Sequence, residues 1–437
     1  MPEVINSMIL FSHATGNANV REAARALNDA GLLSEFWTSI CWNRESALNR
    51  VLPRFVAREL QRRAFSDIGQ AQLRCHPWIE LCRLAARQLN LSSLTGDETG
   101  RFSIDAVYRS LDLRVAQRLQ DAPNFRGVYA YEDGAMASFR AARRLGIKTI
   151  YDLPIGYWRC YRELMAEEQT REPEWASTLQ GRSDSDEKLQ RKDEELSLAT
   201  DIVVASSFVR GTLQKAGPLQ ARVSVLPYGA PAARISRTAS NTKNGKLKVL
   251  FVGALSQRKG LSYLIKAAKQ LGSTTELTLI GRRVSECRPL DTALSMHRWI
   301  PSIAHGALLE EMSRHDVMVF PSLFEGFGLV ILEAMSQGVP VIATPNTAAP
   351  DFVSDGDDGF IVPIRDADAI AQRLEMLTLD RDLLAAMSQE AIRKAAAHSW
   401  EHYRHGVATT VSSVLANDRP VQSPTLRRPH SEVCPSC

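Results

Sequence analysis

The sequence has few cysteines and no long apolar run. Seven cysteines, an odd number, are scattered over 437 residues, which predicts reduced thiols rather than a disulfide framework. No apolar run reaches the roughly 18 residues that indicate a transmembrane helix. The first residues, MPEVINSMIL, lack the basic start and the cleavage site of a secretory signal. We therefore expect a cytoplasmic protein without a membrane span.

A strong charge of one sign is also missing. The net charge is +4 at pH 7, which is too small to indicate a nucleic-acid partner. Residues 50–63 are a local exception, because apolar residues alternate there at helical spacing with Arg54, Arg58, Arg62 and Arg63. Such a stretch could rest on an anionic membrane, at its inner face. An ordinary surface helix with one face in the core is the alternative.

Short apolar strands alternate with helical segments in two parts of the chain. This rhythm predicts an α/β protein with two doubly wound, Rossmann-like domains, and the length exceeds what one core usually holds. We expect an N-terminal domain at residues 1–230, with a basic, mostly helical insertion at about 50–120. A polar linker at 231–246 and a C-terminal domain at 247–395 follow. Residues 396–417 are helical, and the polar, Pro-rich residues 418–437 form a disordered tail.

The strongest candidate site follows the predicted strand at 316–320. In open parallel sheets, ligands bind beyond the carboxyl ends of the strands. A loop at 321–328 leads there into a helix that begins at Leu329. Its glycines allow close backbone approach, and the helix N-terminus favours anions and hydroxyl groups. Carboxylates that suit sugar recognition stand in the loop, at Glu325, and one turn into the helix, at Glu333.

Two further strand ends carry related chemistry. The strand at 247–253 ends at Gly253, and its loop contains Arg258 and Lys259, two cations that could neutralise a diphosphate. The first strand of the chain is followed by a turn that contains Gly16. Each feature is weak when taken alone. The coincidence of the Glu325/Glu333 loop and the Arg258-Lys259 loop at successive strand ends of the C-terminal sheet predicts a binding site for a phosphorylated ligand.

These motifs resemble the signature of the family 4 glycosyltransferases, which are retaining enzymes of the GT-B fold. Glu325 and Glu333 match the family's E-x7-E motif, and Lys259-Gly260 matches its KG motif. Residues 355–363 resemble the following strand and turn, and the helix after Trp400 resembles a C-terminal helix that crosses back to the first domain. The resemblance is specific over about 247–415 and only architectural before that.

The resemblance implies a role for each matched residue. Arg258 and Lys259 would hold the donor diphosphate, and Glu325 would contact hydroxyls of the transferred sugar. Glu333 would bind the ribose, and Gly16 would face the diphosphate across the cleft. Backbone amides near the helix start would contact sugar or phosphate, in a set formed by Gly326, Phe327, Gly328 and Leu329. No metal or other cofactor is implied, because protein cations and helix ends would stabilise the leaving phosphate.

The acceptor side departs from the family. Many members have an arginine where this chain has Ala254, and a histidine near the strand end that here reads Glu132-Asp133. Both carboxylates could bind acceptor hydroxyls, although an Asp-Gly turn that caps a helix explains Asp133 equally well. Asp152 stands at the next strand end, before aromatic residues that could stack on a sugar.

The sequence thus predicts transfer of a hexose from a nucleotide diphosphate sugar to a saccharide or lipid-linked saccharide, in cell-surface polysaccharide synthesis. A nucleotide-sugar epimerase or hydrolase of the same architecture is the main alternative. A dinucleotide oxidoreductase is disfavoured because the first loop lacks G-x-G-x-x-G. A membrane-bound scaffold without activity is disfavoured by the intact donor motifs.

Overall fold

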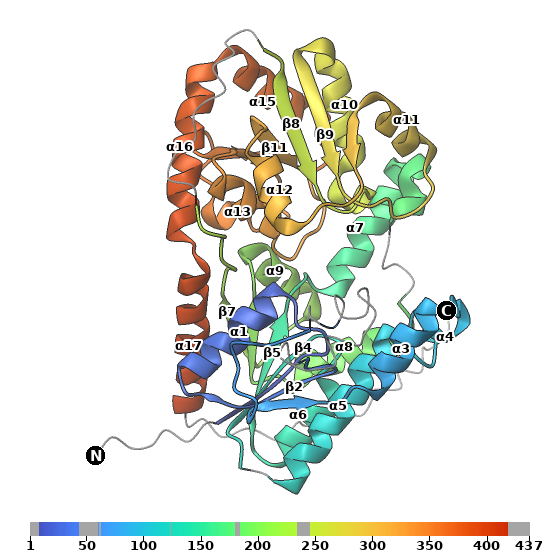
Figure 1. Ribbon diagram of the computed structural model, residues 1–437, viewed down its shortest axis with the longest axis vertical. Helices are drawn as coiled ribbons and strands as arrows, with labels where there is room; N and C mark the ends of the chain where they lie inside the picture. Colours follow the sequence, from blue (N-terminus) through green and yellow to red (C-terminus); the bar gives the residue numbers. More distant parts are fainter. Residues whose placement is uncertain are drawn as a thin grey trace, which may run out of the picture.

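The computed structural model describes residues 8–42, 60, 63–122, 124–179, 184–233 and 245–417. Figure 1 shows two lobes, one above the other, with the helices α16 (Arg381–Ala397) and α17 (Trp400–Ala416) along one side of both. The predicted tail, most of the basic stretch at 50–63 and most of the linker lie outside the described residues. In the part that is described, no helix combines the length and the hydropathy needed to cross a bilayer.

The N-terminal lobe is built on a parallel sheet in the order β3-β2-β1-β4-β5-β6-β7. The order reverses between β1 and β4, so their carboxyl ends flank a crevice. The strands are β1 (Ile9–Ser12), β2 (Leu33–Thr38), β3 (Leu73–Cys75), β4 (Gly127–Tyr131), β5 (Lys148–Leu153), β6 (Asp201–Val204) and β7 (Arg222–Val225).

Helices cover both faces of this sheet. Helices α1 and α17 pack on one face, whereas α5, α6 and α8 pack on the other. The helical segments of the N-terminal half are α1 (Ala18–Asp29), α3 (Trp78–Gln88), α4 (Ser92–Thr95), α5 (Ile104–Asp121), α6 (Met136–Arg144), α7 (Trp158–Arg171), η2 (Pro173–Thr178), α8 (Asp186–Leu198), α9 (Ser207–Thr212) and η3 (Leu213–Ala216).

The C-terminal lobe repeats this plan with the strand order β10-β9-β8-β11-β12-β13, again parallel and with its reversal between β8 and β11. Its strands are β8 (Leu247–Val252), β9 (Thr275–Ile280), β10 (Arg298–Ile300), β11 (Val317–Phe320), β12 (Val341–Ala343) and β13 (Gly359–Ile361). Its other helical segments are η4 (Gln257–Lys259), α10 (Leu261–Leu271), η5 (Gly272–Thr274), α11 (Arg288–Met296), α12 (His305–Met312), α13 (Leu329–Ser336), α14 (Ala349–Phe352) and α15 (Ala367–Leu379).

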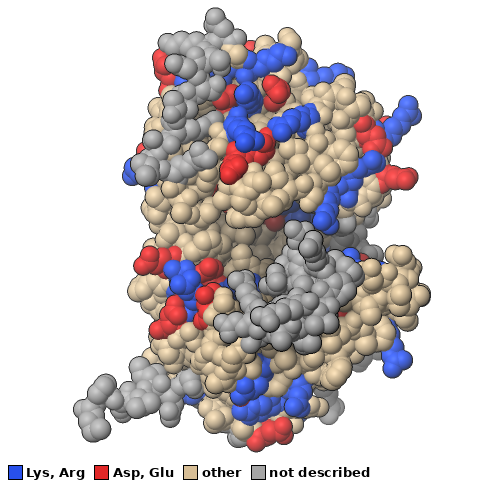
Figure 2. Space-filling view, viewed as in Figure 1, with Lys and Arg blue, Asp and Glu red and all other residues tan. Residues whose placement is uncertain are grey.

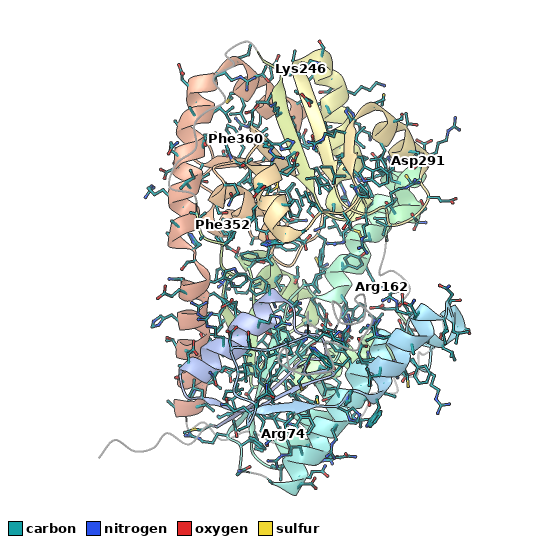
Figure 3. The ribbon with its side chains drawn as sticks, in the orientation of Figure 1. Arg74, Arg162, Lys246, Asp291, Phe352 and Phe360 are labelled. Carbon is teal, nitrogen blue, oxygen red and sulfur yellow. The ribbon has the colours of Figure 1, made fainter. Side chains whose placement is uncertain are left out.

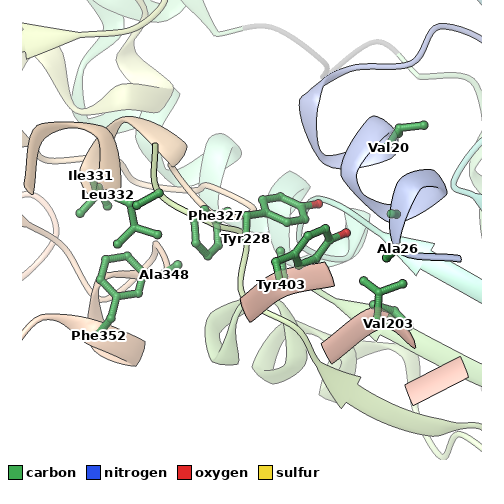
Figure 4. Packing of buried hydrophobic residues seen from close by; sticks show 14 of the residues in the cluster. Val20, Ala26, Val203, Tyr228, Phe327, Ile331, Leu332, Ala348, Phe352 and Tyr403 are labelled. Atoms are coloured by element: carbon green, nitrogen blue, oxygen red, sulfur yellow. The ribbon is translucent and has the colours of Figure 1, made fainter. Parts of the chain in front are cut away.

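Buried aromatic rings join the lobes into one apolar cluster. Tyr228 lies between the lobes, with its ring 5.0 Å from that of Phe327 and 5.5 Å from that of Tyr403 (Figure 4). Phe327 belongs to the loop before α13, and Tyr403 to α17. The crossing helix therefore fixes the relative position of the two lobes through its packing on α1 and on this cluster.

Two segments differ from the sequence-based expectation. Helix α7 and η2 fall in the N-terminal half, yet Met165 and Trp175 are buried in the core of the C-terminal lobe. Glu168 of α7 accepts hydrogen bonds from Gln257 and Arg365 of that lobe, at 2.7 Å each. The insertion expected to be mostly helical also contributes β3, a strand of three residues at the edge of the sheet. Such a short strand leaves no periodicity to recognise.

Candidate active site

The loops after β8 and β11 approach each other closely. Gly260 has a φ of +69°, and a Cβ atom there would lie 1.9 Å from the carbonyl oxygen of Pro321. The amide of Leu323 donates to the Arg258 carbonyl at 2.8 Å. Only glycine allows this approach, so Gly260 brings the Arg258-Lys259 loop against the loop that carries Glu325. A similar close approach involves Gly253, at the end of β8: a Cβ atom at Gly281 would lie 1.8 Å from the Gly253 carbonyl oxygen.

Glu325 meets both cations of the neighbouring loop. Its Oε2 contacts the Lys259 ammonium and lies 3.2 Å from Nη1 of Arg258, which also donates to the Phe324 carbonyl at 2.7 Å. Burial, and next the charge of Arg258, hold the pKa of Lys259 well below its usual range. Burial also lowers the pKa of Arg258. Two partly desolvated cations side by side favour an anion, and one carboxylate offsets only part of their charge.

The glycines around Phe327 place the loop against the other lobe. A Cβ atom at Gly326 would lie 1.8 Å from the Pro154 carbonyl oxygen, in the loop after β5. The Ser206 hydroxyl donates to the Gly326 carbonyl at 2.7 Å. Gly328 has a φ of +88° and directly precedes Leu329, the first residue of α13. The side chain of Phe327 is buried and packs between the lobes, against the ring of Tyr228.

Glu333 lies one turn into α13, and its side chain is mostly buried. Its Oε1 is 2.9 Å from Nε2 of His305, the first residue of α12. His305 is well exposed, with 62% of its side chain accessible. The sequence reasoning missed His305, because nothing in the pattern around residue 305 indicates that α12 begins beside α13.

Across the crevice, His13 shapes the turn that contains Gly16. Nδ1 of His13 accepts hydrogen bonds from the amides of Thr15 and Gly16, at 3.0 Å each. Burial lowers the pKa of His13 to about 3, so the ring is neutral and keeps Nδ1 free to accept. Gly16 has a φ of +71°, and a Cβ there would lie 2.5 Å from the ring of Phe65.

A cavity of about 240 Å³ opens between the lobes. Arg258 and Phe324 contribute from the C-terminal lobe, and Arg162, which Figure 3 shows between the lobes, lies on α7. Glu132 lines the opposite wall, 3.4 Å from Nζ of Lys192. Burial raises the pKa of Glu132 to about 7, and Lys192 opposes that shift. The remaining lining residues are Ile155, Gly156, Trp158, Tyr161, Asp184 and Leu189.

The other two acidic candidates lie outside this lining. Asp133 forms ion pairs with Arg191 at 3.3 Å and with Lys192 at 3.7 Å, and its amide donates to Glu195. Asp152 is buried and accepts a hydrogen bond from the Tyr129 hydroxyl at 2.7 Å. Burial raises the pKa of Asp152 to about 7. The structure therefore brings Glu132 together with Arg258 in one cavity, whereas the carboxylates of Asp133 and Asp152 do not line it and are engaged in ion pairs and in a buried hydrogen bond.

Several cavity residues carry no sequence signal. Lys192 and Asp184 lie 60 and 52 residues from Glu132 in the chain, and Arg162 lies on a helix that crosses to the other lobe. Within the described ranges, no group of three or more His, Cys, Asp and Glu side chains is arranged to hold a metal ion.

The family that matches this chain covers its C-terminal lobe. Residues 233–394 match the family model of the group 1 glycosyl transferases. The putative colanic acid biosynthesis glycosyltransferase WcaL of Escherichia coli K12 is 30% identical over 202 residues, covering 42% of this chain and 49% of that protein. A glycogen synthase of Mycobacterium tuberculosis is 30% identical over 222 residues, covering 49% and 53%. The chain thus spans about half the length of the curated relatives it matches.

Solved structures match nearly the whole chain at low identity. Anabaena HepE in complex with UDP has a TM-score of 0.61 at 16% identity, covering 93% of this chain and 100% of that one. Sucrose-phosphate synthase of Thermosynechococcus elongatus has a TM-score of 0.63 at 16% identity, covering 93% and 99%. The predicted architecture is confirmed. The chain has a GT-B fold, and residues 233–394, which carry Lys259, Glu325 and Glu333, match the group 1 glycosyl transferases.

Proposed function

We propose that this protein is a retaining glycosyltransferase of family 4 that transfers a hexose from a nucleoside diphosphate sugar. The observation that carries the proposal is the contact of Glu325 with Lys259 and Arg258, at the strand ends of the C-terminal sheet and beside the interdomain cavity. A sugar diphosphate presents an anion and a set of hydroxyl groups next to each other. Lys259 and Arg258 supply cations that complement the anion, and Glu325 beside them supplies a carboxylate that complements the hydroxyl groups.

On donor binding, Lys259, Arg258 and Glu325 would exchange their contacts with one another for contacts with the donor. Lys259 and Arg258 would turn to the diphosphate, which would relieve the repulsion between two buried cations. Glu325 would then be free to accept hydrogen bonds from sugar hydroxyls, while Glu333 would bind the ribose. Because HepE of Anabaena was crystallised with UDP, a uridine nucleotide is the first donor to test.

The acceptor would enter the cavity from the N-terminal lobe. Glu132 would hold an acceptor hydroxyl close to Arg258 and to the transferred sugar. Trp158 and Tyr161 would offer ring faces to a saccharide, a common mode of sugar binding. We propose a saccharide or lipid-linked saccharide acceptor and a place in polysaccharide synthesis at the cytoplasmic face of the membrane. The relationship to the colanic acid enzyme supports this assignment.

The reaction would be a displacement on the face from which the donor phosphate leaves. The departing phosphate would accept the proton of the acceptor hydroxyl, and the bond from the anomeric carbon to phosphate would be replaced by one to the acceptor oxygen. Lys259, Arg258 and the N-terminus of α13 would stabilise the charge that develops on the leaving phosphate. Preorganised protein charges would thus take the part that a metal ion plays elsewhere.

A Glu325→Gln variant tests the proposal. Loss of this carboxylate should lower transfer from UDP-glucose by about 100-fold or more, as for other groups that stabilise a transition state. UDP affinity, measured by calorimetry, should fall little or rise, because Lys259 loses its internal competitor. The matched control is Glu390→Gln, which removes a partly exposed carboxylate paired with Arg393 on α16. Transfer near the wild-type rate in Glu325→Gln would refute the site.

The same assay separates transfer from the alternative reactions. A hydrolase or epimerase would consume the donor at its full rate without an acceptor. A transferase should show only slow hydrolysis until a saccharide acceptor is added. Glycosidic product that appears only with acceptor would support the proposal, whereas acceptor-independent turnover at full rate would contradict it.

A further inference from the structure

Two cysteines of the N-terminal lobe lie in contact with each other. Cys75 is the last residue of β3 and stands opposite Thr38 of β2 in the parallel register. Cys41 lies three residues beyond Thr38, in the loop that follows β2. The sulfur of Cys75 accepts hydrogen bonds from the thiol and from the backbone amide of Cys41. The fold thus brings together two thiols that are 34 positions apart in the chain.

A backbone hydrogen bond fixes the residue that follows each cysteine. The amide of His76 donates to the Thr38 carbonyl at 3.0 Å, and the amide of Trp42 donates to the Arg63 carbonyl at 3.2 Å. The side chain of the preceding cysteine takes part in neither bond. Because backbone bonds hold both chain segments, the two thiols meet through the pairing of the strands and the loop that follows, and not only through the rotamer of one side chain.

The contact makes the two thiols chemically unequal. The hydrogen bond from the Cys41 thiol lowers the pKa of Cys75 to about 6, although burial opposes this shift. The same bond, and next to it burial, raise the pKa of Cys41. Cys75 is exposed to solvent, whereas Cys41 is only partly exposed. An exposed thiolate beside a protonated thiol suits thiol–disulfide exchange, in which one sulfur attacks a disulfide and the second completes the reaction.

We propose that Cys75 and Cys41 are a modification site for small disulfides of the glutathione class, and that the product is a reversible Cys41–Cys75 disulfide. The Cys75 thiolate would attack one sulfur of glutathione disulfide, break its S–S bond and release one glutathione thiolate. Cys41 would then lose its proton to solvent and attack the Cys75 sulfur, which releases the second glutathione. Two protein thiols are oxidised to one disulfide, and one glutathione disulfide is reduced to two thiols, so the electrons balance.

The first step prepares the second. Once Cys75 carries glutathione, its sulfur has no negative charge, so the largest cause of the raised pKa of Cys41 is removed. The new bond would tie the loop after β2 to the edge strand β3, at the carboxyl ends of these strands. The site does not depend on the proposed transfer reaction, since none of its atoms belongs to the donor or acceptor contacts.

Peptide mapping of the full chain tests this site. The reduced protein is treated with glutathione disulfide, its remaining thiols are alkylated, and its proteolytic peptides are identified by mass spectrometry without reductant. A peptide that links Cys41 to Cys75 should appear, and dithiothreitol should remove it. The link should form about 10-fold faster or more in the native protein than in the chain unfolded in urea, because the fold holds the thiols in contact. Absence of the link in the native protein would overturn the proposal, and so would an equal rate in urea or a link from Cys75 to any other cysteine.

Single substitutions assign the order of the two steps. Cys41→Ser should retain glutathione on Cys75, because the thiol that would displace it is gone. Cys75→Ser should lose the modification, because Cys41 is only partly exposed. Stable glutathione on Cys41 in Cys75→Ser, together with an unmodified Cys75 in Cys41→Ser, would contradict this order. Equal melting temperatures of the variants and the wild type would show that the fold is retained.

The matched control is Cys82→Ser, which should form the Cys41–Cys75 link as the wild type does. Cys82 is an exposed cysteine of α3, seven positions after Cys75. Helix α3 lies at the right edge of the lower lobe, where Figure 2 shows a mostly uncharged surface. A charged surface therefore does not keep the probe from Cys82, and loss of the link in this control would overturn the assignment to Cys41 and Cys75.

Discussion

A methyl group added at Gly326 would test whether the lobes must approach as closely as they do in this structure. The new Cβ would lie 1.8 Å from the Pro154 carbonyl oxygen and 3.0 Å from Cα of Ile155. Both neighbours are backbone atoms, so no side chain can rotate away. Carbon and oxygen that are not bonded stay about 3.3 Å apart. The two loops would therefore have to separate by about 1.5 Å.

This separation should reduce catalysis more than stability. It would break the hydrogen bond from Ser206 to the Gly326 carbonyl and shift Glu325, the preceding residue. A displacement of about 1 Å at a reacting centre costs about 100-fold in rate. Each lobe keeps its own sheet, and only the part of the shared apolar cluster around Phe327 would be disturbed, so the melting temperature should fall by only a few degrees. The assay is kcat for transfer from UDP-glucose, with thermal unfolding measured in parallel.

Gly306→Ala is the matched control for Gly326→Ala. Gly306 lies in α12, where an added Cβ meets nothing within 4 Å. This change should leave kcat unchanged and raise the stability slightly, because alanine favours a helix. If Gly326→Ala kept the wild-type kcat, the lobes would not need this contact, and the reasoning from their close approach would be refuted.

Three further outcomes are expected. Lys259→Ala should weaken UDP binding by about 10-fold or more in calorimetry, through loss of a charged hydrogen bond; uridine, which has no phosphate, should bind as before, and an equal loss for both ligands would contradict the assignment. Glu333→Ala should weaken UDP and uridine by similar factors because both contain the ribose; a loss confined to UDP would exclude the ribose role. The buried, neutral His13 has a pKa of about 3, below the value of about 6.5 in an unfolded chain, so the unfolded state binds more protons between these values. The free energy of unfolding should therefore fall by about 2 kcal/mol from pH 7 to pH 5 on this account. Urea unfolding of His13→Asn at both pH values should show a smaller fall, and an unchanged fall would place the effect elsewhere.

Much of the fold was predictable from local patterns. The alternation of buried strands and helices predicts two parallel sheets, since strands buried on both faces read as continuous apolar runs. The structure confirms them in the described residues. The strand β3 could not be predicted, because a three-residue edge strand is defined by its pairing with β2 rather than by its own residues.

The candidate site likewise has features that are local in the sequence and features that depend on how the lobes pack. The spacing of Glu325 and Glu333, and the glycines at 260 and 328, are local features. A left-handed turn requires glycine wherever the rest of the chain lies, so its sequence records it. Individual roles for these residues remain predictions.

Only the tertiary structure decided which of these residues meet. Lys259 and Glu325 are 66 positions apart, and Glu132 and Arg258 come from different lobes. Helix α7 belongs to the N-terminal half by sequence and packs on the C-terminal lobe. Contacts of this kind depend on how whole sheets and helices pack, and many different side chains can satisfy such packing. The sequence by itself therefore determined the chemistry available at each strand end, and the packing of the two lobes determined which ends face a common cavity.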